Sequence, residues 1–344
     1  MNKPMQQDSV EGIYKIYLDA IEDRLKQAVN RANTFGDTRL HDMLAYHMGW
    51  KITHRTPEVR GKRIRPLLLL LSCSAAGGDW VHALPGATAV ELVHNFSLIH
   101  DDIEDHSPLR RGRKTVWKKW GIPQAINAGD AMFALAHLEV IDLSITVNAT
   151  IGLQAVEILQ STCFHLTHGQ YLDLSYESHH DLTVDDYWPM VEGKTAALIS
   201  ASTQLGALAA LRDKHLSEIY RQFGHLVGLA FQIQDDLLGI WGNSSLTGKS
   251  SQSDLVTGKI TLPVLFGLSR EGEFSDRWSQ GPITPTELPQ IMRLLELEGA
   301  KSYSQNQATR LLNEALSTLE QAKPIGIAGE ALRMLASSLV GRQT

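Results

Sequence analysis

Residues 91–105 read ELVHNFSLIHDDIED, an apolar stretch that ends abruptly in acidic residues. Its last five positions carry Asp101, Asp102 and Asp105 in the pattern D-D-x-x-D. In a helix, Asp101 and Asp105 lie one turn apart on one face, and Asp102 flanks them. Crowded carboxylates repel one another, and the helix dipole disfavours negative charge at a C-terminus. The pattern therefore predicts a bound cation, and an all-oxygen ligand set favours magnesium, which also takes phosphate oxygens.

The sequence that follows this motif bears on whether the motif is functional. Short motifs often match by chance, so the alternative is a solvated helix end that carries a chance acidic cluster. However, residues 108–112 follow at once and read PLRRG. Arg110 and Arg111 can clamp a diphosphate, because a guanidinium donates paired hydrogen bonds to phosphate oxygens. This context favours a site for a metal and a diphosphate.

A second acidic pair, Asp235 and Asp236, ends another apolar stretch, GHLVGLAFQIQDDLLGIWG. Two lysines, Lys249 and Lys259, follow it in the longest predicted loop. Each acidic helix end is followed by basic residues. This pattern predicts that the two helices face each other across one cavity. Such an arrangement would hold a metal cluster between facing helices of a bundle.

The rest of the chain predicts helices almost throughout, because apolar residues recur with the helical period. Long helices are expected over residues 84–103, 125–145, 151–176, 194–211 and 216–241. Strand signals are scarce, and no Asn-Gly or Asp-Gly turn joins two alternating runs. Polar loops are expected over 108–112, 178–186, 241–258 and 275–289, without repeats or an obvious linker. The sequence therefore predicts an all-α protein, a multi-helix bundle organised as a single domain over residues 1–344.

Composition excludes several classes of protein. Of the 344 residues, 43% are hydrophobic and 20% charged, which excludes a disordered or collagen-like chain. The net charge of −6 is too small to indicate a nucleic-acid partner. Cys73 and Cys163 lie in apolar stretches, so buried free thiols and a reducing compartment are expected. The N-terminus lacks the apolar core of a signal peptide, and no stretch reaches the ~20 apolar residues of a transmembrane segment. A cytoplasmic location is expected.

Taken together, the motifs resemble the trans-isoprenyl diphosphate synthase (polyprenyl synthetase) family. Nine pieces occur in the family's order between residues 60 and 265. They are GKRIRP (61–66), the segment from His94 to Asp105, PLRRG (108–112), NAGDAMFALA (127–136), GQYLDL (169–174), GKTAALI (193–199), FQIQDDLLG (231–239), TGK (247–249) and GKITLPVL (258–265). Each piece alone is weak evidence for the family, and GKRIRP or GKT alone fits a solvated surface. Nine pieces in the family's order are specific evidence for it.

The resemblance implies an all-α fold around a deep central cavity, in a homodimer. It implies head-to-tail condensation of isopentenyl diphosphate with an allylic diphosphate (dimethylallyl, geranyl or farnesyl), with three magnesium ions bridging the allylic diphosphate. By position, it implies magnesium ligands at Asp101, Asp105 and Asp235, with Asp102 and Asp236 supporting them. It implies contacts around the allylic substrate from Arg110, Lys194, Thr195, Gln232, Lys249 and Lys259. It implies an isopentenyl diphosphate site at Lys62, Arg65, His94 and Arg111.

One departure from the family pattern concerns the second aspartate motif. The family usually has D-D-x-x-D there, but the fifth position in this chain is Gly239. A weaker metal site or a slower ionisation is one consequence. Because Asp235 and Asp236 remain and the first motif is complete, an active enzyme is still expected.

The chemistry explains these residue types. Breaking the carbon–oxygen bond to diphosphate gives an allylic cation, and metal ions with Arg and Lys stabilise the departing charge. Apolar helices exclude water, and the loop over 241–258 is expected to close as a lid. The amide of Gln232 could stabilise the cation, and the resemblance implies that the released diphosphate takes the proton.

The depth of the tail pocket is expected to set the product length. Phe96 precedes Asp101 by five residues, which places it about 7–8 Å below the metal site at ~1.5 Å per residue. A bulky ring there could form the pocket floor, with Ser97 leaving room beside it. In the family this pattern resembles synthases of the twenty-carbon geranylgeranyl diphosphate. The alternative is that Phe96 only packs in the core.

The sequence allows several other interpretations. His165 and His168 have helical i, i+3 spacing, but no third zinc ligand is evident, so core or surface histidines are favoured. The rival functions are a class I terpene cyclase, a prenyltransferase with a non-isoprenoid acceptor, and a non-catalytic subunit of a heteromeric synthase. The expected isopentenyl diphosphate site argues against the first two, and the intact first aspartate motif argues against the third.

Overall fold

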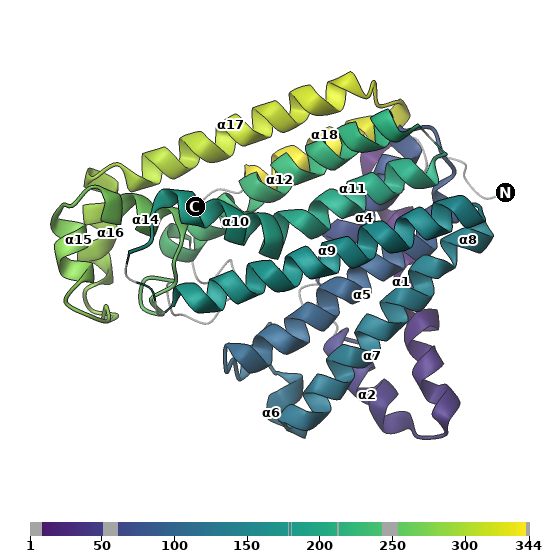
Figure 1. Ribbon diagram of the computed structural model, residues 1–344, viewed down its shortest axis with the longest axis horizontal. Helices are drawn as coiled ribbons and strands as arrows, with labels where there is room; N and C mark the ends of the chain where they lie inside the picture. The colour runs from purple at the N-terminus through teal and green to yellow at the C-terminus, as the bar shows by residue number, and fades with distance from the viewer. Residues whose placement is uncertain are drawn as a thin grey trace. The chain divides into compact units, whose positions relative to one another are not determined.

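The computed structural model describes residues 9–50, 61–177, 179, 181–211, 213–242 and 254–341. Most of these residues are helical, and the strands found among them are only two residues long (Figure 1). The predicted all-α fold is therefore confirmed.

The chain divides into two compact units. Unit 1 comprises Met1–Gln160, Ala201–Tyr220 and Ala322–Leu332, and unit 2 comprises Ser161–Ser200, Arg221–Gln321 and Arg333–Thr344. The single domain expected over residues 1–344 stays a prediction, and so does the cavity expected between the two aspartate motifs.

The described elements of unit 1 are mostly helices from the first half of the chain. They are α1 Val10–Asn30, η1 Arg31–Phe35, α2 Thr38–His47, α4 Ile64–Ala75, α5 Trp80–Glu104, β1 Leu109–Arg110, β2 Arg113–Lys114, α6 Val116–Trp120, α7 Ile122–Ile141 and α8 Leu143–Thr146. The elements wholly in unit 2 are α10 Val184–Val191, η2 Glu192–Ala196, α14 Leu262–Ser269, α15 Glu273–Trp278, α16 Leu288–Leu297 and α17 Ala300–Gln321. Four further helices contribute residues to both units: α9 Ala149–Tyr176, α11 Ala197–Ala209, α12 Lys214–Trp241 and α18 Gly326–Val340.

Helix α5 is the central element of unit 1, because it is apolar around most of its circumference. Asp79 caps its start by accepting a hydrogen bond from the Val81 amide at 3.0 Å. Helices α4 and α7 pack against it, and α7 runs beside α5 in Figure 1. Gly129 lies at this contact, where a Cβ atom would lie 2.1 Å from His100 Nε2, so a larger residue would displace the imidazole. This packing fixes the end of α5 that carries the first aspartate motif.

Two hydrophobic clusters hold the helices of unit 2. The first joins α10, α12 and α14 through Tyr187, Ile233, Leu237 and Leu262. The second joins the last turn of α12 to α14, α15 and α16. Because Ile233 and Leu237 are anchored in the first cluster, the acidic pair between them has a fixed position on α12.

The observed boundaries confirm three predicted helices to within four residues: those over 84–103, 151–176 and 216–241. The helix expected to reach residue 145 ends at Ile141, and α8 follows it. The helix expected over 194–211 begins as the π-helical turn η2. The acidic pair does not end its helix, since α12 continues to Trp241 and buries Ile240.

Two expectations drawn from composition can be checked in the described residues. Cys73 and Cys163 are buried and unpaired, as predicted. None of the described helices combines the length and the apolar character needed to cross a membrane.

Candidate active site

The first aspartate motif lies where α5 ends. Asp101 and Asp102 stand in its last turn, and Asp105 is the residue that follows the helix. Asp102 is 1% exposed, and its Oδ1 accepts a hydrogen bond from Arg110 Nε at 2.8 Å. Its Oδ2 is buried without a hydrogen-bond partner. Burial raises the pKa of Asp102 to about 6, although the charge of Arg110 opposes this.

A two-stranded hairpin presents the two arginines that follow the motif. Strands β1 and β2 are antiparallel, with Arg110 opposite Arg113. The turn consists of Arg111 and Gly112, whose φ angles are 51° and 73°. Positive φ at both central residues is typical of a tight type I′ turn. The expectation of a loop was therefore wrong, and the only local signal for the hairpin was the glycine at the second turn position.

The side chain of Arg111 lies against the backbone of Gly61. A Cβ atom at Gly61 would lie 2.8 Å from Arg111 Nη2, and Gly61 has a φ of +79°. The positive φ favours glycine at this position, and a side chain there would displace the Arg111 guanidinium. Burial and the charge of Arg63 lower the pKa of Arg111.

Arg63, which the sequence did not single out, has a structural role. It stands before α4 with a φ of 49° and is 5% exposed. It donates hydrogen bonds to Glu91 Oε1 at 2.8 Å and to Glu22 Oε2 at 3.2 Å. Two carboxylates balance the charge of Arg63, which stabilises the start of α4, and its Nη2 atom is buried without a hydrogen-bond partner.

Arg65 and His94, both assigned to the isopentenyl diphosphate site, meet between α4 and α5. Arg65 Nη1 lies 3.4 Å from His94 Nε2. Burial, followed by the charges of Arg65 and Arg111, holds the pKa of His94 well below its usual value. The imidazole is therefore neutral and can accept a hydrogen bond from Arg65. Arg65 Nε is buried without a hydrogen-bond partner, and buried positive charge of this kind favours an incoming anion.

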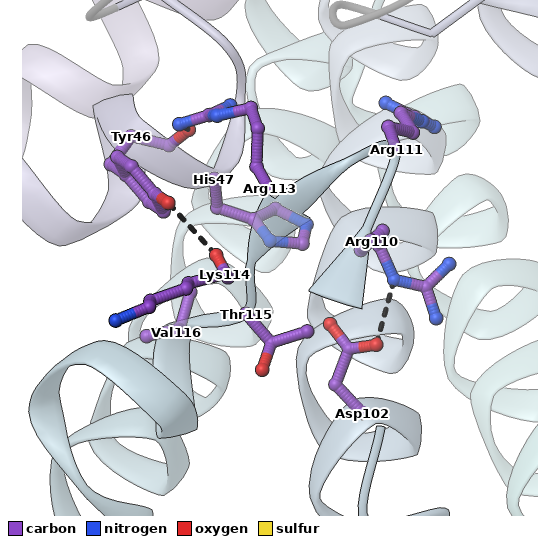
Figure 2. Close-up of a pocket in the computed structure, with 9 residues that line it drawn as sticks. All are labelled: Tyr46, His47, Asp102, Arg110, Arg111, Arg113, Lys114, Thr115 and Val116. Atoms are coloured by element: carbon purple, nitrogen blue, oxygen red, sulfur yellow. Dashed lines mark hydrogen bonds and ion pairs between the residues drawn. The ribbon is translucent and has the colours of Figure 1, made fainter. Parts of the chain in front are cut away.

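A small cavity of about 20 Å³, roughly the space of one water, lies beside the hairpin. Figure 2 shows its lining residues, with the imidazole of His47 between the hairpin and α2. Burial and the charges of Arg110 and Arg111 lower the pKa of His47 to about 3, so this ring is neutral. Tyr46 holds the hairpin, because its hydroxyl donates to the Lys114 carbonyl at 2.8 Å. Sequence reasoning missed His47, because it ends a helix that carries no recognisable motif.

The second acidic pair lies on α12 in unit 2. Asp236 is 2% exposed, and its two oxygens accept three hydrogen bonds: from the Tyr187 hydroxyl at 2.8 Å, Gln232 Nε2 at 2.8 Å and the Leu262 amide at 3.3 Å. Burial raises its pKa to about 6. The amide oxygen of Gln232 accepts a hydrogen bond from Thr195 Oγ1 at 2.6 Å. Thr195 therefore orients Gln232, and Gln232 contacts Asp236.

Lys194 forms an ion pair with Asp173, a residue of the GQYLDL piece that the sequence did not single out. The pair depends on a close approach of α9 to η2. A Cβ atom at Gly169 would lie 2.1 Å from the Lys194 amide nitrogen, and one at Gly193 would lie 2.8 Å from Gly169 Cα. The carboxylates of Asp254, Asp236, Asp173 and Asp235 raise the pKa of Lys259 despite its burial.

Phe96 is half-buried and lies among aromatic rings in unit 1. Its ring centroid is 5.0 Å from that of Phe133 on α7 and 5.7 Å from that of His100. The Ser97 hydroxyl donates to the His94 carbonyl at 2.9 Å. Phe133, which lies in the NAGDAMFALA piece, was missed as a candidate pocket residue.

Lys62 and Lys249 are the remaining residues that the sequence predicts to bind substrate. Lys62 is exposed just before α4. Lys249 and residues 243–253 of the expected lid lie outside the described residues.

The carboxylates fit magnesium ions that are completed by water and phosphate. Among the described residues, no three His, Cys, Asp or Glu side chains converge closely enough to hold a metal ion by themselves. Magnesium in proteins usually binds one or two carboxylates and takes its other ligands from water and substrate phosphates. The buried Oδ2 atoms of Asp102 and Asp254 lack hydrogen-bond partners, so both carboxylates have an oxygen to offer.

Comparison with known proteins identifies the family. The family model for polyprenyl synthetases matches residues 50–294, which is more than half of the chain. The chain belongs to the polyprenyl synthetase family. This polyprenyl synthetase is therefore a prenyltransferase, and the resemblance to trans-isoprenyl diphosphate synthases is confirmed.

Similar proteins cover most of the polyprenyl synthetase chain. A (2E,6E)-farnesyl diphosphate synthase from Mycobacterium tuberculosis is 36% identical, covering 94% of this chain and 91% of its own. A geranylgeranyl diphosphate synthase from the same species is 39% identical, covering 82% of each chain. The crystal structure of a polyprenyl synthetase from Streptomyces coelicolor A3(2) matches with a TM-score of 0.88 at 32% identity, covering 96% of this chain and 100% of its own.

Proposed function

We propose that this protein condenses isopentenyl diphosphate with an allylic diphosphate, head to tail, to give a short-chain all-trans prenyl diphosphate, and that it depends on magnesium. The observation that carries the proposal is the pairing of Arg65 with His94, close enough to Arg111 that the charge of Arg111 lowers the pKa of His94. A synthase of this kind needs a site for a second diphosphate, whereas a cyclase does not. The similarity to farnesyl and geranylgeranyl diphosphate synthases supports the same reaction.

We propose that Asp101, Asp105 and Asp235 bind magnesium, in line with the resemblance. Magnesium, when bound, would neutralise the charge of the departing diphosphate. Arg110 and Lys194 are proposed to donate hydrogen bonds to the allylic diphosphate. Both are held by carboxylates, Asp102 and Asp173 respectively, which fixes their orientation before substrate arrives.

In the reaction the allylic carbon–oxygen bond breaks to give an allylic cation and diphosphate. The double bond of isopentenyl diphosphate attacks the cation, a carbon–carbon bond forms, and a proton leaves for the released diphosphate. Gln232 is proposed to stabilise the cation with its amide oxygen. Thr195 and Asp236 bind the two ends of that amide, so its dipole has a fixed direction.

We propose geranylgeranyl diphosphate, with twenty carbons, as the main product. Phe96 and Phe133 supply two aromatic rings from α5 and α7 that pack edge to face, with centroids 5.0 Å apart. Two rings that pack against each other form a more rigid floor than one. If the floor sets chain length, Phe96→Ala and Phe133→Ala should each lengthen the product. Unchanged products in both variants would mean that these rings only pack in the core.

We propose that the protein works as a homodimer. Large apolar side chains are exposed along α7 and α9, with Ile141 at 48%, Leu153 at 73% and Phe164 at 75% exposure. Exposed apolar surface of this kind usually marks a protein interface. Light scattering coupled to gel filtration should give about twice the chain mass of 38.1 kDa. A mass of one chain would contradict this proposal.

The experiment that tests the reaction is an incubation with magnesium, labelled isopentenyl diphosphate and, separately, dimethylallyl, geranyl and farnesyl diphosphates. The products would be dephosphorylated and sized. A linear prenyl alcohol is expected, and its carbon number tests the proposed chain length. Release of diphosphate without uptake of label would indicate a cyclase. No activity until a second protein is added would indicate a subunit of a heteromeric synthase.

A further inference from the structure

The position of Gly239 explains how this chain departs from the D-D-x-x-D pattern. Gly239 lies on α12, one helical turn after Asp235. A Cβ atom built at Gly239 would lie 1.9 Å from Asp254 Oδ2 and 2.6 Å from Asp254 Cγ. The carboxyl group of Asp254 therefore occupies the space that a side chain at the fifth motif position would fill.

The segment that carries Asp254 is fixed against α12. The Asp254 amide donates a hydrogen bond to the Gly239 carbonyl at 3.2 Å, and the Asp254 carbonyl accepts one from the Lys259 amide at 2.9 Å. The next residue, Leu255, is 1% exposed and packs in the cluster that contains Ile240. The backbone hydrogen bonds and the buried side chain of Leu255 therefore hold Asp254 beside Gly239.

The chemistry around Asp254 favours a cation. Its Oδ2 atom is buried and has no hydrogen-bond partner. Its charge raises the pKa of both Lys259 and Asp236. Four carboxylates raise the pKa of Lys259: Asp173, Asp235, Asp236 and Asp254.

We propose that Asp254 supplies, from the segment after α12, the carboxylate that the second motif lacks at its fifth position, and that Gly239 is required to admit it. The inference rests on the proposed function, because it assigns Asp254 to the magnesium held on this side by Asp235. Asp254 is thus a metal-binding residue, and its site is built from two segments instead of one helix turn. The competing explanation is that Asp254 serves only as a counter-ion for Lys259.

Two single variants separate these explanations. Asp254→Asn keeps the shape of the side chain and removes its charge. Gly239→Ala removes no acidic group, yet its methyl group displaces the Asp254 carboxylate. Each should weaken binding of Mn²⁺ in the presence of inorganic diphosphate by at least about tenfold, the usual loss when a ligand or its support is removed. Titration followed by electron paramagnetic resonance measures this affinity without turnover.

Gly239→Ala gives the sharpest contrast. If Gly239 were only a glycine inside a helix, alanine would raise the stability of α12 by up to about 1 kcal/mol and leave Mn²⁺ affinity unchanged. That result would overturn the proposal. So would an Asp254→Asn variant that binds Mn²⁺ like the wild type. The exposed Asp185 on α10 offers a matched control, because Asp185→Asn changes net charge equally and should leave affinity unchanged.

A double variant tests the exchange of positions directly. Gly239→Asp with Asp254→Ala restores a carboxylate within the motif and clears the space for it. It should bind Mn²⁺ more tightly than Asp254→Ala alone, and equal affinity would overturn the proposal. Circular dichroism establishes that each variant folds. If the wild type makes product but the variants bind Mn²⁺ normally, this inference alone fails. A wild type that binds no Mn²⁺ with diphosphate would remove the proposed function as well.

Discussion

Replacing Asp102 with asparagine should make the protein more stable and less active. The ordinary pKa of an aspartate is 3.8, and burial raises that of Asp102 to about 6. At about 1.4 kcal/mol per pKa unit, keeping this group charged in the folded protein costs roughly 3 kcal/mol. Asparagine carries no charge, and its Oδ1 can still accept the hydrogen bond from Arg110 Nε. The amide group would replace Oδ2, which has no partner to lose.

The sign of the pH dependence follows from linkage. The folded protein binds the proton of Asp102 more tightly than the unfolded chain does, so wild-type stability falls as pH rises from about 4 to about 6. Asp102→Asn should match the wild type near pH 4 and exceed it by up to about 3 kcal/mol above pH 6. With an unfolding entropy of about 2.1 cal/mol/K per residue over 344 residues, that is about 4 °C in Tm.

The assay is thermal unfolding from pH 4 to pH 8 in the presence of EDTA, with the difference between variant and wild type plotted against pH. Asp236→Asn is the matched control. Burial raises its pKa to about 6 as well, so the difference between Asp236→Asn and the wild type should change with pH in the same direction. Its oxygens accept three hydrogen bonds, however, so the asparagine NH2 group would point at a donor, and Asp236→Asn should be less stable than Asp102→Asn at every pH. A difference for Asp102→Asn that does not change with pH, or a variant less stable than the wild type at pH 8, would refute the reasoning.

Three further predictions concern individual steps of the proposed reaction. Gly61→Ala should displace Arg111 and raise the KM for isopentenyl diphosphate by about tenfold or more, with a smaller effect on the allylic KM. Phe96→Ala should lengthen the main product by one or more isoprene units, as measured by chromatography of the dephosphorylated alcohols. Thr195→Val should lower kcat by about tenfold and leave both KM values nearly unchanged, because it frees the amide of Gln232, whereas Thr195→Ser should retain activity.

Much of the fold follows from local pattern. The helix that carries Asp101 was predicted within four residues of its observed ends, because apolar periodicity and the cap at Asp79 are properties of neighbouring residues. The same holds for α9 and α12. The motifs were found for a related reason, since each is a short segment whose residue types reveal the charge it must bind. The hairpin at Arg111 was missed because its turn lacks the usual Asn-Gly or Asp-Gly pair.

The sequence by itself determined the all-α class, the family and the positions of both aspartate motifs. Tertiary structure alone decided which polar groups meet: Asp102 with Arg110, Lys194 with Asp173, and the neutral imidazole of His47 with the arginines of the hairpin. It also decided that the place left empty at Gly239 is filled by Asp254, fifteen residues later in the chain. The reason is physical. Helix formation depends on residues a few positions apart, whereas burial and charge pairing depend on how separate segments pack.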